Sequence, residues 1–367
     1  MNRSPSFACA IVLMFTLAAC SIAAPADEPS LTARADYPAA ATQRTPPEPR
    51  GFGEALPEAE VREIRLPAPY DDARMEYSGL AWFGDTLVLL PQYPKRLGAD
   101  GSAFLVTIKK EAILVYLGAK NDEPIEISLM AFDDGGLSDT LVGFEGFEAL
   151  AFSGNEVFVT IETSGGSPMM GYLAAGRVTE DGGAISLDAG KIVPLEPQTD
   201  FRNASDESLL IADGRIYTFF EDNGSALNPH PFAHVFDMKL NPLPDCDFPN
   251  IEFRVTDATE LQPDGSFWVM NYFYPQDSHL KTGVDPIAER YGEGRTHTRS
   301  DRVERILRLR IENGRIFLAE EAPLYLSLTA EGSSRNWEGL VRLDDLGFLA
   351  VTDSFPRSIL CFISDLE

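Results

Sequence analysis

The chain has 367 residues, and 57 Asp and Glu against 30 Lys and Arg give it a formal net charge of −27 at pH 7. Nucleic acid and anionic membrane surfaces are bound by clustered Lys and Arg, so this balance argues against both partners. It is compatible with cation binding, although a surface kept dispersed by charge accounts for most of it.

The N-terminus predicts a signal peptide over residues 1–19. A single charge precedes an apolar run over residues 7–18, which is too short to span a membrane. The run ends in Leu17-Ala18-Ala19-Cys20, which resembles a bacterial lipobox, in which the cysteine is lipidated and becomes the first mature residue. An ordinary secretory signal is the alternative. Because Ser21 rather than aspartate follows, we expect a lipid-anchored cell-envelope protein, in the outer membrane if the cell is Gram-negative.

Residues 20–58 are rich in Ala, Pro, Thr and charge without periodicity, which predicts a disordered tether after the lipidated Cys20. Residues 59–367 then form the folded part, a size that all-β folds reach as one unit. Cys246 and Cys361 are left as candidates for a disulfide in an oxidising compartment. We expect none, because the fold predicted below places them in non-adjacent blades.

A short phrase recurs five times along the chain: a small or acidic residue, a hydrophobic run, a tight turn and a second hydrophobic run. A supersecondary unit repeated at intervals of tens of residues predicts a propeller or a solenoid. The copies begin at Tyr77-Ser78-Gly79-Leu80-Ala81, Phe147-Glu148-Ala149-Leu150-Ala151, Asp206-Glu207-Ser208-Leu209-Leu210, Thr259-Glu260-Leu261-Gln262 and Trp337-Glu338-Gly339-Leu340-Val341.

Each copy predicts a β-hairpin, because dipeptides such as Gly154-Asn155 and Asp213-Gly214 supply the positive φ of tight turns. Further strand-like runs follow each hairpin, and four strands make a propeller blade. The last unit has only three, so residues 61–66 are expected to supply its fourth strand. The sequence therefore predicts an all-β fold, a five-bladed β-propeller closed by an N-terminal strand. A sixth blade is the alternative, although the segment 277–301, where it would lie, is expected to be loop.

In a blade the first strand leaves the top face and the second returns to it, so its opening and closing residues meet at one rim. Carboxylates that converge there repel one another unless their pKa values rise or a cation lies among them. Oxygen-only donors suit Ca²⁺, and the absence of His and Cys from the repeat disfavours zinc. Alternatively, each glutamate only accepts hydrogen bonds from backbone amides. The candidate metal ligands are Ser78, Glu148, Glu207, Glu260 and Glu338, with Gln92, Glu162, Glu221 and Asp353 beside them.

Basic residues collect in the loops expected above this rim. In so acidic a chain they indicate an anionic ligand such as a phosphate ester, which arginine forks bind well. The alternative is a solvated loop with ordinary charges. The candidate substrate-binding residues are Arg74, Arg202, Arg335, Asn336 and Asp353. The long segment 275–302 also carries Lys281, Arg290, Arg295, Arg299 and Arg302, together with His279 and His297, which we expect to be ordinary loop residues.

These motifs resemble the phytase-like propeller domain called "esterase-like activity of phytase", over roughly residues 60–367. The likeness is carried by Ser78-Gly79-Leu80-Ala81-Trp82, Phe147-Glu148-Ala149-Leu150-Ala151, Arg202-Asn203 with Glu207, and Trp337-Glu338-Gly339-Leu340 with Thr352-Asp353. The rim pattern is also similar to calcium-activated nucleotidases (apyrases), which are five-bladed propellers with a central Ca²⁺. That resemblance implies ligand roles for Ser78, Glu148, Glu207 and Glu338, and least firmly for Glu260. Ala149 and Ser208 stand where the family usually has glycine.

Two functional hypotheses follow. The first is a lipid-anchored, Ca²⁺-dependent hydrolase of a phosphate or other anionic ester, with Glu162 or Glu221 as general base. The second is a non-catalytic ligand- or protein-binding propeller, whose Ca²⁺ only makes the channel rigid. Fold alone does not choose between them, because propellers host both kinds of protein.

Overall fold

Antiparallel hairpins follow one another along the chain, as the repeats predicted. The computed structural model describes residues 55–98, 101–119, 123–164, 169–201, 204–281, 283–330 and 333–365, all within the compact unit Pro46–Glu367. The predicted signal peptide, Cys20 and most of the predicted tether lie outside the described residues. The described structure begins at residue 55, a few residues before the expected boundary, because Leu56 and the strand β1 (Glu58–Ala59) already pair with later parts of the chain.

The first two hairpin units join into one eight-stranded sheet, since their outermost strands β6 and β10 pair in parallel. The first unit contains β3 (Tyr77–Phe83), β4 (Thr86–Pro91), β5 (Ala103–Lys109) and β6 (Ser128–Asp133). The second contains β7 (Phe144–Ser153), β8 (Glu156–Thr163), β9 (Met170–Val178) and β10 (Ala184–Leu195).

The next two units form separate sheets. A four-stranded sheet contains β11 (Asp206–Ala212), β12 (Arg215–Phe220), β13 (Phe232–Asp237) and β14 (Pro242–Asp247). A six-stranded sheet contains β15 (Arg254–Ala258), β16 (Ser266–Phe273), β17 (Val303–Glu312), β18 (Arg315–Leu318), β19 (Leu324–Leu326) and β1. All the strands described between β15 and β20 thus belong to one sheet.

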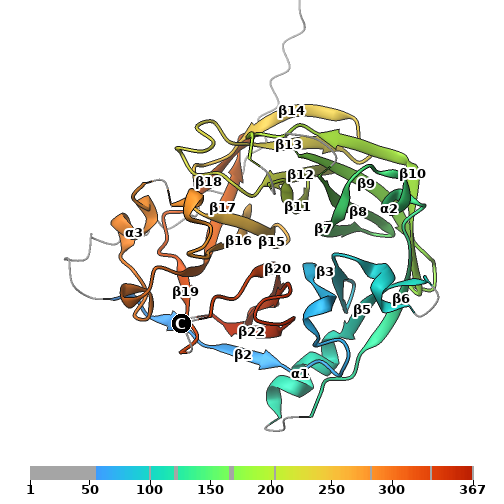
Figure 1. Ribbon diagram of the computed structural model, residues 1–367, viewed down its shortest axis with the longest axis horizontal. Helices are drawn as coiled ribbons and strands as arrows, with labels where there is room; N and C mark the ends of the chain where they lie inside the picture. Colours follow the sequence, from blue (N-terminus) through green and yellow to red (C-terminus); the bar gives the residue numbers. More distant parts are fainter. Residues whose placement is uncertain are drawn as a thin grey trace, which may run out of the picture. The chain divides into compact units, whose positions relative to one another are not determined.

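The last sheet confirms the closure predicted from the N-terminal strand. It contains β20 (Trp337–Leu343), β21 (Gly347–Thr352), β22 (Leu360–Ser364) and β2 (Val61–Ile64). Val61 lies opposite Ile363 and Ile64 opposite Leu360 in an antiparallel register. Figure 1 shows the blue β2 beside the red β22, so the two ends of the fold are held in one sheet.

The innermost strands form a ring. β3 contacts β7, β7 contacts β11, β11 contacts β15, β15 contacts β20, and β20 contacts β3 again. These strands are almost wholly buried, as the side chains of β3 and β11 illustrate, and Figure 1 shows all five around the middle of the molecule. The architecture is therefore an all-β propeller whose inner strands surround one axis.

Each inner strand carries a register shift at the recurring phrase. In β3, β11 and β20 the extra residue of the bulge is Ser78, Glu207 and Glu338, and wider shifts occur in β7 and β15. A bulge leaves one residue unpaired and re-aims its side chain. The phrase that looked like a simple strand start is therefore the signature of a bulge that turns a polar side chain out of the ladder.

The fourth copy of the phrase was predicted in the wrong register. Val255 pairs with Asn271 and Arg254 with Tyr272, so the bulge of β15 lies between Val255 and Ala258. The true fourth copy is therefore Val255-Thr256-Asp257-Ala258, and the predicted Glu260 follows the strand instead of opening it. Glu260 carries the same carboxylate as the acidic residue of the other copies, so the sequence alone did not reveal the shift in register.

The structure also contains helices that the sequence did not predict. α1 (Lys110–Gly118) buries Ile113 and Tyr116 but leaves Val115 exposed, so its apolar residues showed no helical stripe. The segment expected to be loop contains η3 (Ser278–Leu280), α3 (Pro286–Tyr291) and η4 (His297–Arg299). Shorter turns are η1 (Ala73–Met75), η2 (Pro94–Leu97) and α2 (Leu137–Thr140). Among the described residues, no helix has the length and apolar character needed to cross a bilayer. Cys246 and Cys361 are buried and free, as expected.

Two bulge residues of β15 tie the inner strands together. Asp257 is buried, and its Oδ2 accepts the Leu340 N–H of β20 at 2.7 Å while its Oδ1 accepts the Ala258 N–H at 2.8 Å. Thr256 Oγ1 donates to the Trp337 carbonyl of the same neighbouring strand. In this copy the carboxylate, Asp257, therefore accepts hydrogen bonds from backbone amides, which is the alternative to metal binding stated above.

We expect Asp257→Asn to lower the free energy of unfolding by about 2 kcal/mol, because its amide turns an N–H donor toward a backbone N–H. Urea unfolding followed by circular dichroism measures this. The matched control is Asp213→Asn in an exposed turn with φ of 50°, where Asn is tolerated. Equal stability of the two variants would contradict the assigned role of Asp257.

Candidate functional site

A polar pocket of about 370 Å³ lies where the inner strands begin and their partner strands end. The residues around it come from all five bulged strand pairs and from the loops beside them. Its lining consists of Ser78, Gln92, Glu148, Glu162, Glu207, Arg254, Tyr272, Tyr274, Asp277, Asn336, Glu338 and Asp353. We call this group the mouth pocket.

Most of the residues predicted at the rim do meet in the mouth pocket. Four of the five predicted metal positions line it, as do the predicted catalytic Glu162 and the predicted substrate-binding Asn336 and Asp353. Glu260 does not, and instead lines a cavity of about 60 Å³ with Leu80, Leu150 and other residues further along the inner strands. The reason is the register of the fourth copy, which puts Glu260 beyond the end of β15.

Two of the predicted anion-binding arginines are engaged elsewhere. Arg335 is buried, and its guanidinium pairs with Glu304 at 2.7 Å. Arg74 is exposed and pairs with Asp72 at 2.9 Å. Neither lines the mouth pocket, and Arg202 lies outside the described residues.

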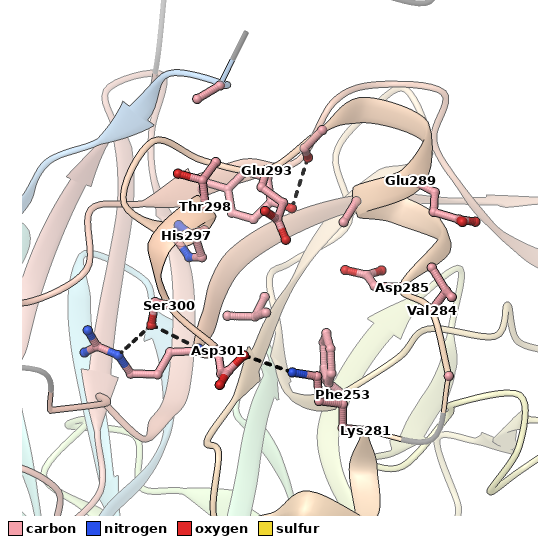
Figure 2. A pocket seen from close by; sticks show the side chains of 17 residues that line it. Phe253, Lys281, Val284, Asp285, Glu289, Glu293, His297, Thr298, Ser300 and Asp301 are labelled. Atoms are coloured by element: carbon pink, nitrogen blue, oxygen red, sulfur yellow. Dashed lines mark hydrogen bonds and ion pairs between the residues drawn. The ribbon is translucent and has the colours of Figure 1, made fainter. Parts of the chain in front are cut away.

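The basic segment of the fourth unit surrounds a different cavity of about 710 Å³. Figure 2 shows Lys281 paired with Asp301 at its edge, and His297 facing it. His297 Nδ1 lies 2.8 Å from Glu58 Oε1, and its Nε2 accepts the Glu304 N–H. These pairings fasten the segment to β1 and β17, so the segment serves the fold more than the mouth pocket.

Arg254 is the functional residue that sequence reasoning missed. It opens β15, directly before the true fourth copy, at the strand position that Gly146, Ser205 and Asn336 occupy in other units. Its Nη1 forms an ion pair with Glu221, and its Nε lies 3.2 Å from Asp277 Oδ2. A search for the bulge pattern opposite Asn271-Tyr272 would have found it.

Glu221 stands behind the pocket. Its side chain is fully buried, and the ion pair with Arg254 is its described contact at one oxygen, Oε2. Burial raises the pKa of Glu221, and Arg254 opposes that rise. Because Glu162 lines the pocket and Glu221 does not, the two predicted catalytic glutamates occupy different kinds of position.

A few hydrogen bonds orient the carboxylates inside the pocket. Gln92 Nε2 donates to Glu148 Oε1 at 3.3 Å, and Tyr272 Oη donates to Glu338 Oε1 at 3.0 Å. Asp353 Oδ1 accepts the Phe355 N–H at 2.8 Å. Gln92 and Tyr272, at the ends of second strands, therefore each hold the opening glutamate of the next unit along the chain.

Crowding and burial make these carboxylates weak acids. Burial raises the pKa of Glu148 well above its ordinary value, and the neighbouring Glu162 adds to the effect. Burial likewise raises the pKa of Glu207, reinforced by Glu338, and the pKa of Glu338, reinforced by Asp353. A bound cation would oppose these shifts, because a nearby positive charge favours the ionised form of a carboxyl group.

The donor set fits a hard divalent cation. As the side chains stand, no group of three or more His, Cys, Asp or Glu in the described part of the chain is arranged to hold a metal ion. The acceptors are nevertheless present, since Glu162 Oε1, Glu207 Oε2 and Asn336 Oδ1 are buried without a hydrogen-bond partner among the described residues. Buried oxygens of this kind are rarely left unpaired. Carboxylate and amide oxygens of this kind are the ligands that Ca²⁺ prefers.

Comparisons with known proteins do not identify a relative. No family model and no curated protein matches the chain. Among solved structures, a glucose dehydrogenase is 12% identical over 84% of this chain and 99% of its own, with a TM-score of 0.44. A glutaminyl cyclase from Myxococcus xanthus is 9% identical over 85% and 100%, with a TM-score of 0.42. The WD40 repeats of RRP9 are 7% identical over 85% and 99%, with a TM-score of 0.36. Values this low carry no argument about activity, which rests on the site itself.

The raised carboxylate pKa values predict a pH dependence. Each folded-state pKa lies above the unfolded value, so the folded protein holds more protons and loses stability as the pH rises from about 4.5 toward the folded pKa. Glu207→Gln removes one such group. In EDTA, we expect it to melt at a higher temperature than the wild type, by a margin that widens from about pH 5 to pH 8.

Differential scanning calorimetry at several pH values measures this margin. Glu60→Gln, at an exposed position, is the matched control and should show no widening. A margin for Glu207→Gln that stays constant with pH would contradict the assigned shift.

Proposed function

We propose that the chain is a five-bladed, lipid-anchored β-propeller of the phytase-like family that binds Ca²⁺ in the mouth pocket and hydrolyses a phosphate or other anionic ester there. The count of five blades is supported by the closed ring of five inner strands, each of which begins its own hairpin unit. The cation is supported by one observation above all: six carboxyl groups line a single pocket, and buried oxygens among them lack donors.

Residues on four bulged strands would hold the cation: Ser78, Glu148, Glu207 and Glu338. When bound, the cation supplies positive charge to an ester oxygen and to an attacking water. Glu162 is the group placed to take a proton from that water, because it lines the pocket and its Oε1 has no described donor. Burial raises the pKa of Glu162 toward the range in which a general base works best at neutral pH. Glu221, paired with Arg254 behind the pocket, positions that arginine instead.

A non-catalytic propeller with a structural Ca²⁺ is the second candidate. It is favoured by the engagement of Arg74 and Arg335 in ion pairs away from the mouth pocket, which removes two of the groups expected to bind an anion. In this alternative the cation only relieves repulsion among the carboxylates.

Cation binding is tested by thermal unfolding of a soluble fragment beginning at residue 46, in EDTA and with graded Ca²⁺. A ligand of the folded state alone stabilises it by about 2.7 kcal/mol at 100 times Kd, so the melting temperature should climb with Ca²⁺. The melting temperature of Glu338→Gln should rise much less with Ca²⁺, and that of Glu60→Gln should rise as in the wild type. A wild-type melting temperature indifferent to Ca²⁺ would sink the proposal.

Hydrolysis is then tested with p-nitrophenyl phosphate and a panel of phosphate esters. We expect turnover only with Ca²⁺, and a loss of about 100-fold or more in kcat for Glu162→Gln with Ca²⁺ binding retained. Ca²⁺ binding without turnover of any ester would select the structural alternative.

We also propose that Cys20 carries the lipid that anchors the protein to the cell envelope. In a bacterial host fed an alkyne-labelled palmitate, the full chain should take up label and sediment with membranes. Cys20→Ser should lose both properties, and Cys246→Ser, a change at a cysteine buried in the fold, should keep them. Label retained in Cys20→Ser would show that the anchor lies elsewhere.

A further inference from the structure

Arg254 has a singular place in the mouth pocket. It is the one Lys or Arg among the described residues that line it, against six carboxyl groups. Its side chain is 12% exposed, and that exposed part belongs to the pocket wall. Among the described residues, the pocket lining thus contains one guanidinium group and six carboxyl groups.

The guanidinium is held in place from behind and from the side. Glu221, fully buried, pairs with Nη1, and Asp277 accepts from Nε at 3.2 Å. An arginine clamped in this way has already lost most of its rotamer freedom in the free protein. Arginine presents a planar fork that matches carboxylate and phosphate oxygens, so an ordered one on a pocket wall is suited to receive an anion.

The carboxylates around it oppose that role until they are neutralised. Glu207 raises the pKa of Arg254, and Arg254 in turn lowers the pKa of Glu338, so both carboxyl groups lie close to the guanidinium. Glu207 Oε2 has no described hydrogen-bond partner. An anion that approaches these carboxyl groups is repelled by each one that is ionised. A divalent cation held by the carboxylates would reverse the balance and give the pocket two positive poles.

We propose that Arg254 receives the anionic end of the ligand and that anion binding at this residue requires prior occupation of the carboxylates by a divalent cation. This inference rests on the cation site of the proposed function and adds the residue that binds the anion. The ligand class is a small phosphate or phosphonate monoanion or dianion. By linkage, the anion must raise the affinity for the cation by the same factor by which the cation raises the affinity for the anion.

Isothermal titration calorimetry tests the proposal with methylphosphonate, whose carbon–phosphorus bond is not an ester, as the probe. We expect wild-type protein to bind methylphosphonate in saturating Ca²⁺ and at least tenfold more weakly in EDTA. Titrating Ca²⁺ in the presence of methylphosphonate should show the same factor. Equal phosphonate affinity with and without Ca²⁺ would overturn the coupling.

The variants separate Arg254 from the cation site. The double variant Arg254→Gln/Glu221→Gln removes both charges of the ion pair, so that no buried charge is left alone. We expect it to bind Ca²⁺ within a few-fold of the wild type and to lose methylphosphonate binding at least tenfold. Arg254→Lys keeps the charge and the pairing with Glu221, and should weaken the phosphonate through loss of the fork. If the double variant does not fold, Arg254→Lys supplies the test.

The matched control is Arg74→Gln, which removes an exposed arginine outside the pocket and should leave both affinities unchanged. Methylphosphonate binding that survives in the Arg254 variants overturns this inference while the cation site stands. If the wild type binds Ca²⁺ but no methylphosphonate, this inference is likewise overturned while the cation site stands. Failure of the wild type to bind Ca²⁺ overturns the proposed function, and this inference with it.

Discussion

Repulsion among carboxylates held together out of water is the constraint on which the rest of this structure depends. Five inner strands meet around one axis, and six carboxyl groups from these strands, a partner strand and the neighbouring loops line one pocket at their beginning. Burial and mutual repulsion raise the pKa values of Glu148, Glu207 and Glu338. A fold that keeps such a cluster stores an electrostatic cost, and a cation offsets that cost when it binds.

The bulge at each inner strand is the local device that creates this arrangement. In most units it turns an oxygen-bearing side chain toward the pocket, as Ser78, Glu207 and Glu338 illustrate. In the fourth unit the same irregularity supplies Asp257, which accepts backbone N–H groups, and places Arg254 just before it. One repeated backbone feature thus provides candidate binding residues in some units. In the fourth unit it provides a tie between strands, next to the one arginine among the described residues that line the pocket.

The remaining basic residues show how the chain distributes its few cations. Arg335 pairs with buried Glu304, and His297 joins Glu58 to the backbone of β17. The His297 contacts fasten the long segment of the fourth unit to β1 and β17, and the Arg335–Glu304 pair joins the residues before β20 to β17. Among the described residues that line the mouth pocket, Arg254 is the one Lys or Arg, which is why the proposed anion binding centres on this side chain.

The sequence by itself determined the hairpin repeats, the closing N-terminal strand and most of the acidic rim. Those features depend on local properties, namely turn dipeptides, alternating apolar runs and a polar residue at a constant place in the unit. It could not determine the register of the fourth copy, because Glu260 carries the same chemistry as the true rim residues only a few positions from Thr256. Strand pairing across to Asn271 and Tyr272 decided that register. The sequence also could not show which arginines are free to contact a ligand. Only the packing shows that Arg335 pairs with Glu304 while Arg254 lines the pocket.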